Sequence, residues 1–100
     1  MTIELKKFGI TLVSRPAGRE AFQAIRPLLK TGESVRVDFD GVLAVTPSWV
    51  DEFLTLLLEH TSRVELMKTD NASVLATLRV LAEANQGAVA DLSRKFLHAQ

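Results

Sequence analysis

The feature that most constrains the fold is a repeated change of hydrophobic period along the chain. Val35, Val37 and Phe39 alternate with charged residues, which is the two-residue period of a strand. A helical period follows from Val50 to Leu58, and similar pairs of patterns come before and after it. The order strand, helix, strand, helix, strand, helix indicates a sheet covered by helices, with right-handed crossovers between parallel strands.

The N-terminal third predicts a strand region followed by a helix. Residues 2–13 favour a strand or a short hairpin, with the glycine in their middle as a turn or bulge. The apolar spacing from Ala17 to Lys30 predicts an amphipathic helix that starts at Ser14 or Pro16. Because Pro27 lacks an N–H group, a kink or an early end is expected there.

The middle of the chain predicts a buried strand that leads into a second helix. Val42–Val45 lack alternation, which is typical of the buried end of a central strand. Pro47 suits the first position of the next helix, and Thr46 or Ser48 can cap its free N–H groups.

The C-terminal region predicts a short strand at residues 63–66 and a helical segment at about residues 71–98, capped by Asp70 or Asn71. The segment is either one long helix or two helices broken near Gly87. Its apolar residues follow a loose heptad, with Asn85 in the gap, at Leu75, Leu78, Ala82, Val89, Leu92 and Phe96. On a continuous helix this stripe would favour a homodimer.

Composition narrows the class of protein. The 100 residues predict a single domain, residues 1–100, and the 12 basic residues cancel the 12 acidic ones without forming a basic stripe, which argues against nucleic acid as a partner. No apolar run approaches the roughly 20 residues of a membrane span. There is no signal-peptide pattern and no cysteine, so we expect a cytoplasmic protein.

The residues that carry chemistry do not form a catalytic pattern. There is no phosphate-binding glycine loop or nucleophile elbow, and His60 and His98 are too far apart for a metal site, so no cofactor or metal is expected. Asp38 and Asp40 are a solvated edge, partners of an arginine, or a catalytic pair that lacks a third group.

Two arginines lie near the start of the first predicted helix. Arg15 and Arg19 either pair with neighbouring carboxylates or form a shared anion site with helix N–H groups. The sequence leaves both interpretations open.

The run from Val35 to Leu54 resembles the STAS-like domain family, through Val-Arg-Val-Asp-Phe-Asp-Gly-Val followed by Thr-Pro-Ser-Trp-Val-Asp-Glu-Phe-Leu. These are small bacterial proteins of unknown function, related in pattern to STAS domains, the sulfate transporter and anti-sigma factor antagonist module. Phe8-Gly9, Ser14-Arg15 and Gly18-Arg19 also match, so the resemblance covers residues 8 to about 68.

The resemblance implies a small mixed α/β sheet of about four strands, with helices packed mainly on one side. It also implies regulatory binding to a protein partner such as a histidine-kinase-like ATPase or an anti-sigma-type regulator. Antagonists of this type are phosphorylated on a serine at the start of the helix after the central strand. Here Pro47 occupies that position, which leaves Ser48 and Thr46 as candidate phosphorylation sites.

We therefore predict a non-catalytic, regulatory protein-binding module. The alternatives are a small nucleotide- or anion-binding domain and a structural dimerisation module. Trp49 is either a core residue or, if partly exposed, an interaction anchor. The predicted partner-binding loop and helix start comprise Thr46, Ser48, Trp49, Asp51 and Glu52.

Overall fold

The computed structural model describes residues 1–61, 63–84 and 86–99. Within these residues, the main sheet has three parallel strands in the order β1-β3-β5, formed by Thr2–Glu4, Val35–Asp38 and Val64–Leu66. Val37 in the central strand is completely buried, whereas its neighbour Arg36 is exposed. The alternation that predicted this strand therefore divides its side chains between the core and the open face of the sheet.

A second, smaller parallel sheet pairs β2 (Thr11–Leu12) with β4 (Ala44–Val45). A 3-10 helix at Leu5–Phe8 separates β1 from β2, and the two strands belong to different sheets. The predicted single strand or hairpin over residues 2–13 is therefore wrong. The expected mixed sheet of about four strands is also not seen, because the five described strands divide between two parallel sheets.

The chain turns sharply between β3 and β4. The Asp38 carboxylate accepts a hydrogen bond from the Asp40 N–H at 2.9 Å, and Gly41 adopts a φ of 85° that favours glycine. This turn moves the following residues out of the main sheet. The sequence had predicted that Val42–Val45 form the buried end of the central strand. That prediction is wrong, because these residues do not continue β3.

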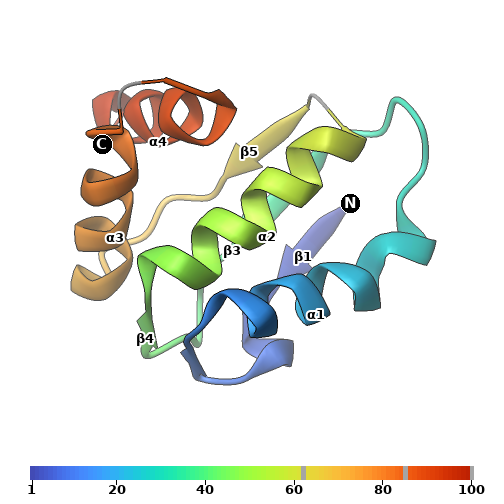
Figure 1. The fold of residues 1–100 in the computed structure, drawn as a ribbon, viewed down its shortest axis with the longest axis horizontal. Coiled ribbons are helices and arrows are strands. Elements are labelled where there is room, and N and C mark those ends of the chain that lie inside the picture. The colour runs from blue at the N-terminus through green and yellow to red at the C-terminus, as the bar shows by residue number, and fades with distance from the viewer. Residues whose placement is uncertain (62, 85, 100) are drawn as a thin grey trace.

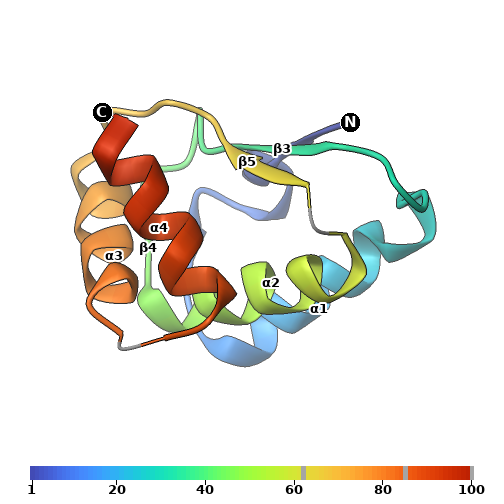
Figure 2. The same cartoon turned by 90° about the horizontal axis from the view of Figure 1, so that it is seen from above.

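Four helices are described, and they lie on one side of the main sheet (Figures 1 and 2). Helices α1 (Arg15–Ile25) and α2 (Pro47–His60) lie side by side beneath the strands, and α3 (Ala72–Ala82) and α4 (Ala88–Ala99) pack on each other at one end. This arrangement agrees with the expected packing of helices mainly on one side.

Local sequence signals set the bounds of α1. The Ser14 hydroxyl accepts a hydrogen bond from the Ala17 N–H at 3.3 Å, which confirms Ser14 as the N-cap. A short 3-10 helix, Arg26–Leu28, follows α1, so the predicted early end near Pro27 is also confirmed.

The contact between α1 and α2 is unusually close at Gly18. A Cβ atom built on Gly18 would lie 2.5 Å from the carbonyl oxygen of Trp49, so only glycine fits without a shift of one helix. The close approach brings the start of α1 against the start of α2.

The C-terminal segment is two helices, which settles one of the alternatives left by the sequence. The predicted role of Asn85 lies outside the described residues. Leu78, Val89 and Phe96 are buried within the chain, so the stripe expected for a continuous helix is divided between two helices that pack inward. The main argument for a homodimer is lost with that stripe.

Candidate functional site at the start of α2

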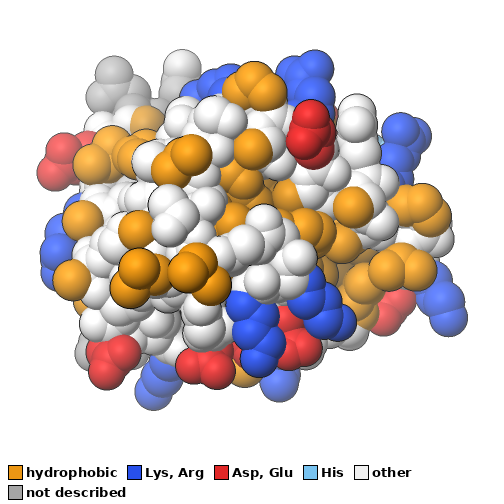
Figure 3. All heavy atoms as spheres, turned by 90° about the horizontal axis from the view of Figure 1, so that it is seen from below, with side chains coloured by type: hydrophobic (Ala, Val, Ile, Leu, Met, Phe, Trp, Pro, Cys, Tyr) orange, Lys and Arg blue, Asp and Glu red, His pale blue; other side chains and the backbone are white. Residues whose placement is uncertain are grey.

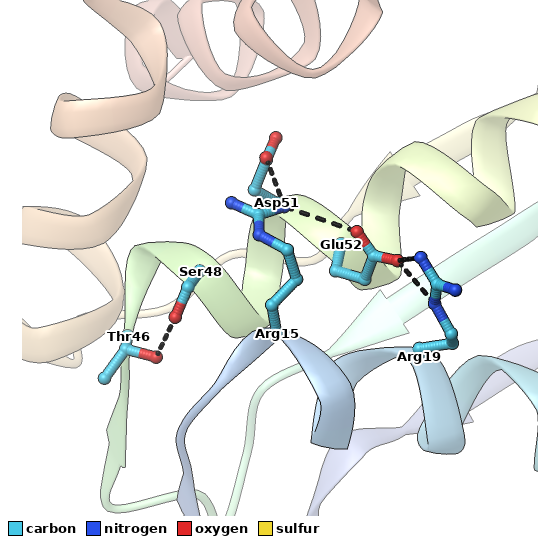
Figure 4. A network of polar contacts seen from close by, with 6 residues as sticks. All are labelled: Arg15, Arg19, Thr46, Ser48, Asp51 and Glu52. Carbon is cyan, nitrogen blue, oxygen red and sulfur yellow. Dashed lines mark hydrogen bonds and ion pairs between the residues drawn. The ribbon is translucent and has the colours of Figure 1, made fainter.

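The start of α2 is an open helix end. Thr46 occupies the N-cap position and Pro47 is the first helical residue, as predicted. The Thr46 side chain makes no capping hydrogen bond, and its hydroxyl lies 3.3 Å from the hydroxyl of Ser48 (Figure 4). The sequence offered Thr46 or Ser48 as the capping side chain, and the Thr46 side chain does not fill this role. Both hydroxyls are half-buried.

Side chains of α3 hold the loop before α2 in place. The Ser73 hydroxyl accepts a hydrogen bond from the Val45 N–H at 3.0 Å and donates to the Val45 carbonyl at 3.2 Å. The Asn71 amide donates to the carbonyls of Val42 and Leu43 at 2.9 and 3.2 Å. These side chains bond the backbone of Val45 in β4 and of the two residues that precede β4.

Asn71 also serves as the N-cap of α3, because its carbonyl oxygen accepts from the Val74 N–H at 3.0 Å. The sequence had offered Asp70 or Asn71 for this role. It gave no sign that the same side chain bridges to the loop before α2.

The two arginines of α1 pair with two carboxylates of α2 (Figure 4). Arg15 Nη1 lies 2.9 Å from Asp51 Oδ2 and 3.3 Å from Glu52 Oε1. Arg19 donates to Glu52 Oε2 from Nη2 at 2.8 Å and from Nε at 2.9 Å. The sequence left open whether Arg15 and Arg19 pair with carboxylates or form an anion site, and the structure shows pairing with carboxylates. Their partners are residues of α2 and not Asp38 or Asp40.

This network shifts the pKa of two of its members, Glu52 and Arg15. Hydrogen bonds from Arg19, which outweigh the opposing effect of burial, hold the pKa of the Glu52 carboxyl below its ordinary value. The hydrogen bond to Asp51 is the main cause that raises the pKa of the Arg15 guanidinium. The four groups carry two positive and two negative charges, so the network is neutral at pH 7.

Trp49 is a core residue. Its side chain is 1 % exposed and stacks on Phe53 with ring centroids 5.1 Å apart. Phe8 completes the aromatic cluster at 6.4 Å from Trp49. The alternative interpretation of Trp49 as an exposed anchor is therefore wrong.

The sequence missed a group of exposed apolar side chains beside this helix start. Ile10, Val13 and Leu43 are 61, 48 and 68 % exposed, and we call these three residues the tip. The Leu43 N–H donates to the Ile10 carbonyl at 2.7 Å, which places the segments before β2 and β4 side by side. These segments lie at the lower end of Figure 1, and Figure 3 shows several exposed hydrophobic side chains on the face seen from that end.

A shallow cleft of ≈ 340 Å³ lies beside the tip, between β2 and α1. Val13 is on its rim, and Phe8, Leu12 and Trp49 are among the residues that line it. The cleft gives a partner's apolar side chain a place to enter next to the tip.

The remaining candidates do not join this site. Asp38 is engaged in the turn after β3, and Asp40 is exposed. His60 is the last residue of α2, and His98 lies in the last turn of α4. Within residues 1–61, 63–84 and 86–99, no group of three or more His, Asp or Glu side chains could hold a metal ion.

Comparison with known proteins identifies a family. The sequence profile described as a STAS-like domain of unknown function matches residues 17–74. The match begins at residue 17, so Phe8-Gly9 and Ser14-Arg15 lie outside it. It extends past the expected end near residue 68 and includes Asn71 and Ser73, which hold the loop before α2. Searches of curated proteins and of solved structures gave no significant match. Within the part of the chain that is described, no helix has the length and apolar character needed to cross a membrane.

Proposed function

Because the chain belongs to the family of STAS-like domains of unknown function, we propose that it is a non-catalytic regulatory module that binds a protein partner through the tip and the start of α2. Thr46, Ser48 and Asp51 supply the polar part of this surface, and all three are half-buried. The Thr46 N–H donates to the carbonyl of Leu12, the residue before Val13, at 3.0 Å. Glu52 acts indirectly, by fixing the arginines of α1.

The tip is the observation that carries this proposal. Five large hydrophobic side chains are exposed among the described residues, and three of them are Ile10, Val13 and Leu43. Apolar side chains that gather on one exposed surface are typical of a protein interaction site, whereas isolated ones are not. The neutral arginine–carboxylate network next to the tip adds no net charge that would keep an apolar partner away.

Regulation by phosphorylation extends the proposal to Ser48. A phosphate on this hydroxyl would lie near the uncapped N–H groups of α2 and the positive end of its dipole. Asp51 and Glu52 would oppose the phosphate by charge, but their pairing with Arg15 and Arg19 reduces that repulsion. The partner class that this mode of regulation suggests is a histidine-kinase-like ATPase or an anti-sigma-type regulator.

The two alternatives receive less support. An anion- or nucleotide-binding site would need Arg15 and Arg19 to leave their carboxylate partners. A dimerisation module would need a continuous C-terminal stripe, and that stripe is interrupted between α3 and α4.

The test is affinity capture from the native lysate with wild-type protein and three variants. Ile10→Glu with Leu43→Glu places two charges on the tip, and Ser48→Arg blocks the helix start. Val80→Glu is the matched control, because Val80 is 54 % exposed near the C-terminal end of α3, whereas Asn71, which contacts Leu43, lies at the opposite end of that helix. We expect the same protein to be captured by the wild type and the control and to be lost from the other two.

Circular dichroism and the melting temperature must stay close to those of the wild type in every variant. Capture that survives both the tip variant and Ser48→Arg would contradict the proposed surface.

A further inference from the structure

Strand β5 presents an unpaired edge. It is the last strand in the order β1-β3-β5, and its other neighbour position is empty among the described residues. Arg63 accepts from the Val35 N–H at 2.8 Å and Met67 donates to the Val37 carbonyl at 2.9 Å. Because bonding residues alternate in a parallel ladder, the N–H and C=O groups of Val64 and Leu66 point away from β3.

This edge borders a groove rather than open solvent. The groove has a volume of ≈ 560 Å³, and its opposite wall is the second half of α4 (Figures 1 and 2). Leu92 and Phe96 of α4 line that wall, and Met67 lines the strand side. We call this the β5–α4 groove. Because β5 forms one wall and α4 the other, the groove combines backbone donors and acceptors that are free among the described residues with an apolar wall.

The charges of the groove are not balanced. Arg36 and Glu65 form a pair at 3.2 Å across β3 and β5. Lys68 and Lys95 also line the groove and are exposed, and no carboxylate of the described residues lies within ion-pair distance of either ammonium group. Two positive charges of the groove therefore have no carboxylate partner among residues 1–61, 63–84 and 86–99, in a chain whose formal net charge is zero.

We infer that the β5–α4 groove binds an extended, acidic segment of a protein partner, which adds to β5 as a further strand. The backbone of Val64 and Leu66 supplies the hydrogen bonds, and Leu92 and Phe96 receive alternate apolar side chains. Lys68 and Lys95 pair with carboxylates of the segment. This site is separate from the tip, so its test can fail while the proposed function stands.

A second copy of this chain fits the groove less well than an acidic segment. Two β5 edges paired antiparallel would place both α4 helices on the same face of the joined sheet. Each copy would bring its own Lys68 and Lys95 to the joined edge, and four like charges gathered there are unfavourable. Charge complementarity therefore selects an acidic segment.

The experiment selects binders from a displayed library of random heptapeptides and then follows backbone amide exchange in the bound protein. We expect the enriched peptides to alternate apolar and acidic residues. Binding of the best one should slow exchange at the amides of Val64 and Leu66. Glu65 and Met67 serve as internal controls, since their amides already face β3.

Variants then test the charges and the wall. Lys68→Glu with Lys95→Glu should weaken the selected peptide by about tenfold or more, as expected from two reversed ion pairs. Leu92→Glu should weaken peptide binding to a similar degree, because it places a charge on the apolar wall of the groove. Lys6→Glu with Lys7→Glu, which reverses two exposed lysines outside the groove, should leave its affinity within about twofold.

Four results would overturn the inference. The first is an enriched peptide that binds without slowing exchange at Val64 and Leu66. The second is peptide binding that does not respond to the lysine reversals. The third is a library that enriches no peptide. The fourth is exchange at these amides that is already slow in the free protein and becomes fast on dilution, because a second copy would then occupy the edge.

Discussion

The tip and the β5–α4 groove differ in what they offer a partner. The tip is a group of exposed apolar side chains next to a neutral charge network. The groove is concave and, within the part of the chain that the structure describes, has unbonded backbone groups on one wall and two lysines without a carboxylate partner. Binding at the tip should therefore depend on buried apolar area, and binding in the groove on backbone hydrogen bonds and charge.

The two surfaces also differ in how they relate to the family match. Helix α4, which forms one wall of the groove, lies outside residues 17–74, whereas the start of α2 lies inside them. The tip is divided, since Leu43 is inside the match and Ile10 and Val13 are outside it. Of these surfaces, only the start of α2 lies entirely within the residues that match the family.

Gly18→Ala should have the largest effect on stability. The new Cβ would meet the Trp49 carbonyl oxygen at 2.5 Å, so α1 must move away from α2. We expect the free energy of unfolding to fall by about 3 kcal/mol, near the upper end for overpacking and despite the better helix propensity of alanine. Urea unfolding measures the change.

Gln23→Ala is the control for Gly18→Ala, because Gln23 is exposed on the same helix and its change should fall within about 0.5 kcal/mol. A Gly18→Ala variant as stable as the wild type would show that α1 and α2 do not need this close approach. The contact between the two helices would then not be what positions the start of α2 beside the tip.

Asn71→Ala tests whether α3 holds the tip. The change removes the N-cap of α3 and the two hydrogen bonds to the carbonyls of Val42 and Leu43. We expect a loss of about 2 kcal/mol in the free energy of unfolding, with weaker partner capture at the tip and unchanged peptide binding in the groove.

Asn71→Asp separates these two roles, since it keeps the capping oxygen and loses the amide donor. Asp70→Ala is the neighbouring control and should have little effect. If Asn71→Ala weakened both surfaces equally, the tip and the groove would not be independent.

Acid should destabilise the charge network near the tip. The pKa of Glu52 is lower in the folded chain than in the unfolded one, so its contribution to stability is complete above the unfolded value of about 4.3. The contribution is lost as the pH falls through the lower, folded pKa. Urea unfolding between pH 7 and pH 3 should show a steeper fall for the wild type than for Glu52→Gln.

Equal slopes in the wild type and Glu52→Gln would contradict the role of Arg19 in lowering this pKa. Glu20→Gln provides the control, because Glu20 is an exposed carboxylate of α1. Its slope should match that of the wild type.

The smallest expected effect is that of salt, which should lower the affinity of the groove more than that of the tip. Raising the ionic strength from about 50 to 500 mM screens the exposed lysines of the groove. Peptide affinity in the groove should fall several-fold, whereas capture at the tip should change little. Fluorescence anisotropy of the labelled peptide measures the first and quantitative capture the second. A salt-independent groove would remove Lys68 and Lys95 from its recognition.

Local patterns in the sequence correctly predicted most helices and two strands, because periodicity reports which side of an element is buried. Val35–Asp38, Val64–Leu66, the Ser14 cap and the early end of α1 were all predicted in this way. The resemblance carried by residues 35–54 also led to the family that the comparison confirms.

Interactions between distant residues were decided only by the tertiary structure. Arg15 pairs with Asp51, 36 positions away, and Asn71 reaches back 29 positions to Val42. The division of five strands into two sheets depends on one tight turn after Asp38 and one 3-10 helix after β1. A local pattern cannot specify such partners, because each depends on how the helices pack. The tip and the β5–α4 groove arise for the same reason, from segments that are brought together only by folding.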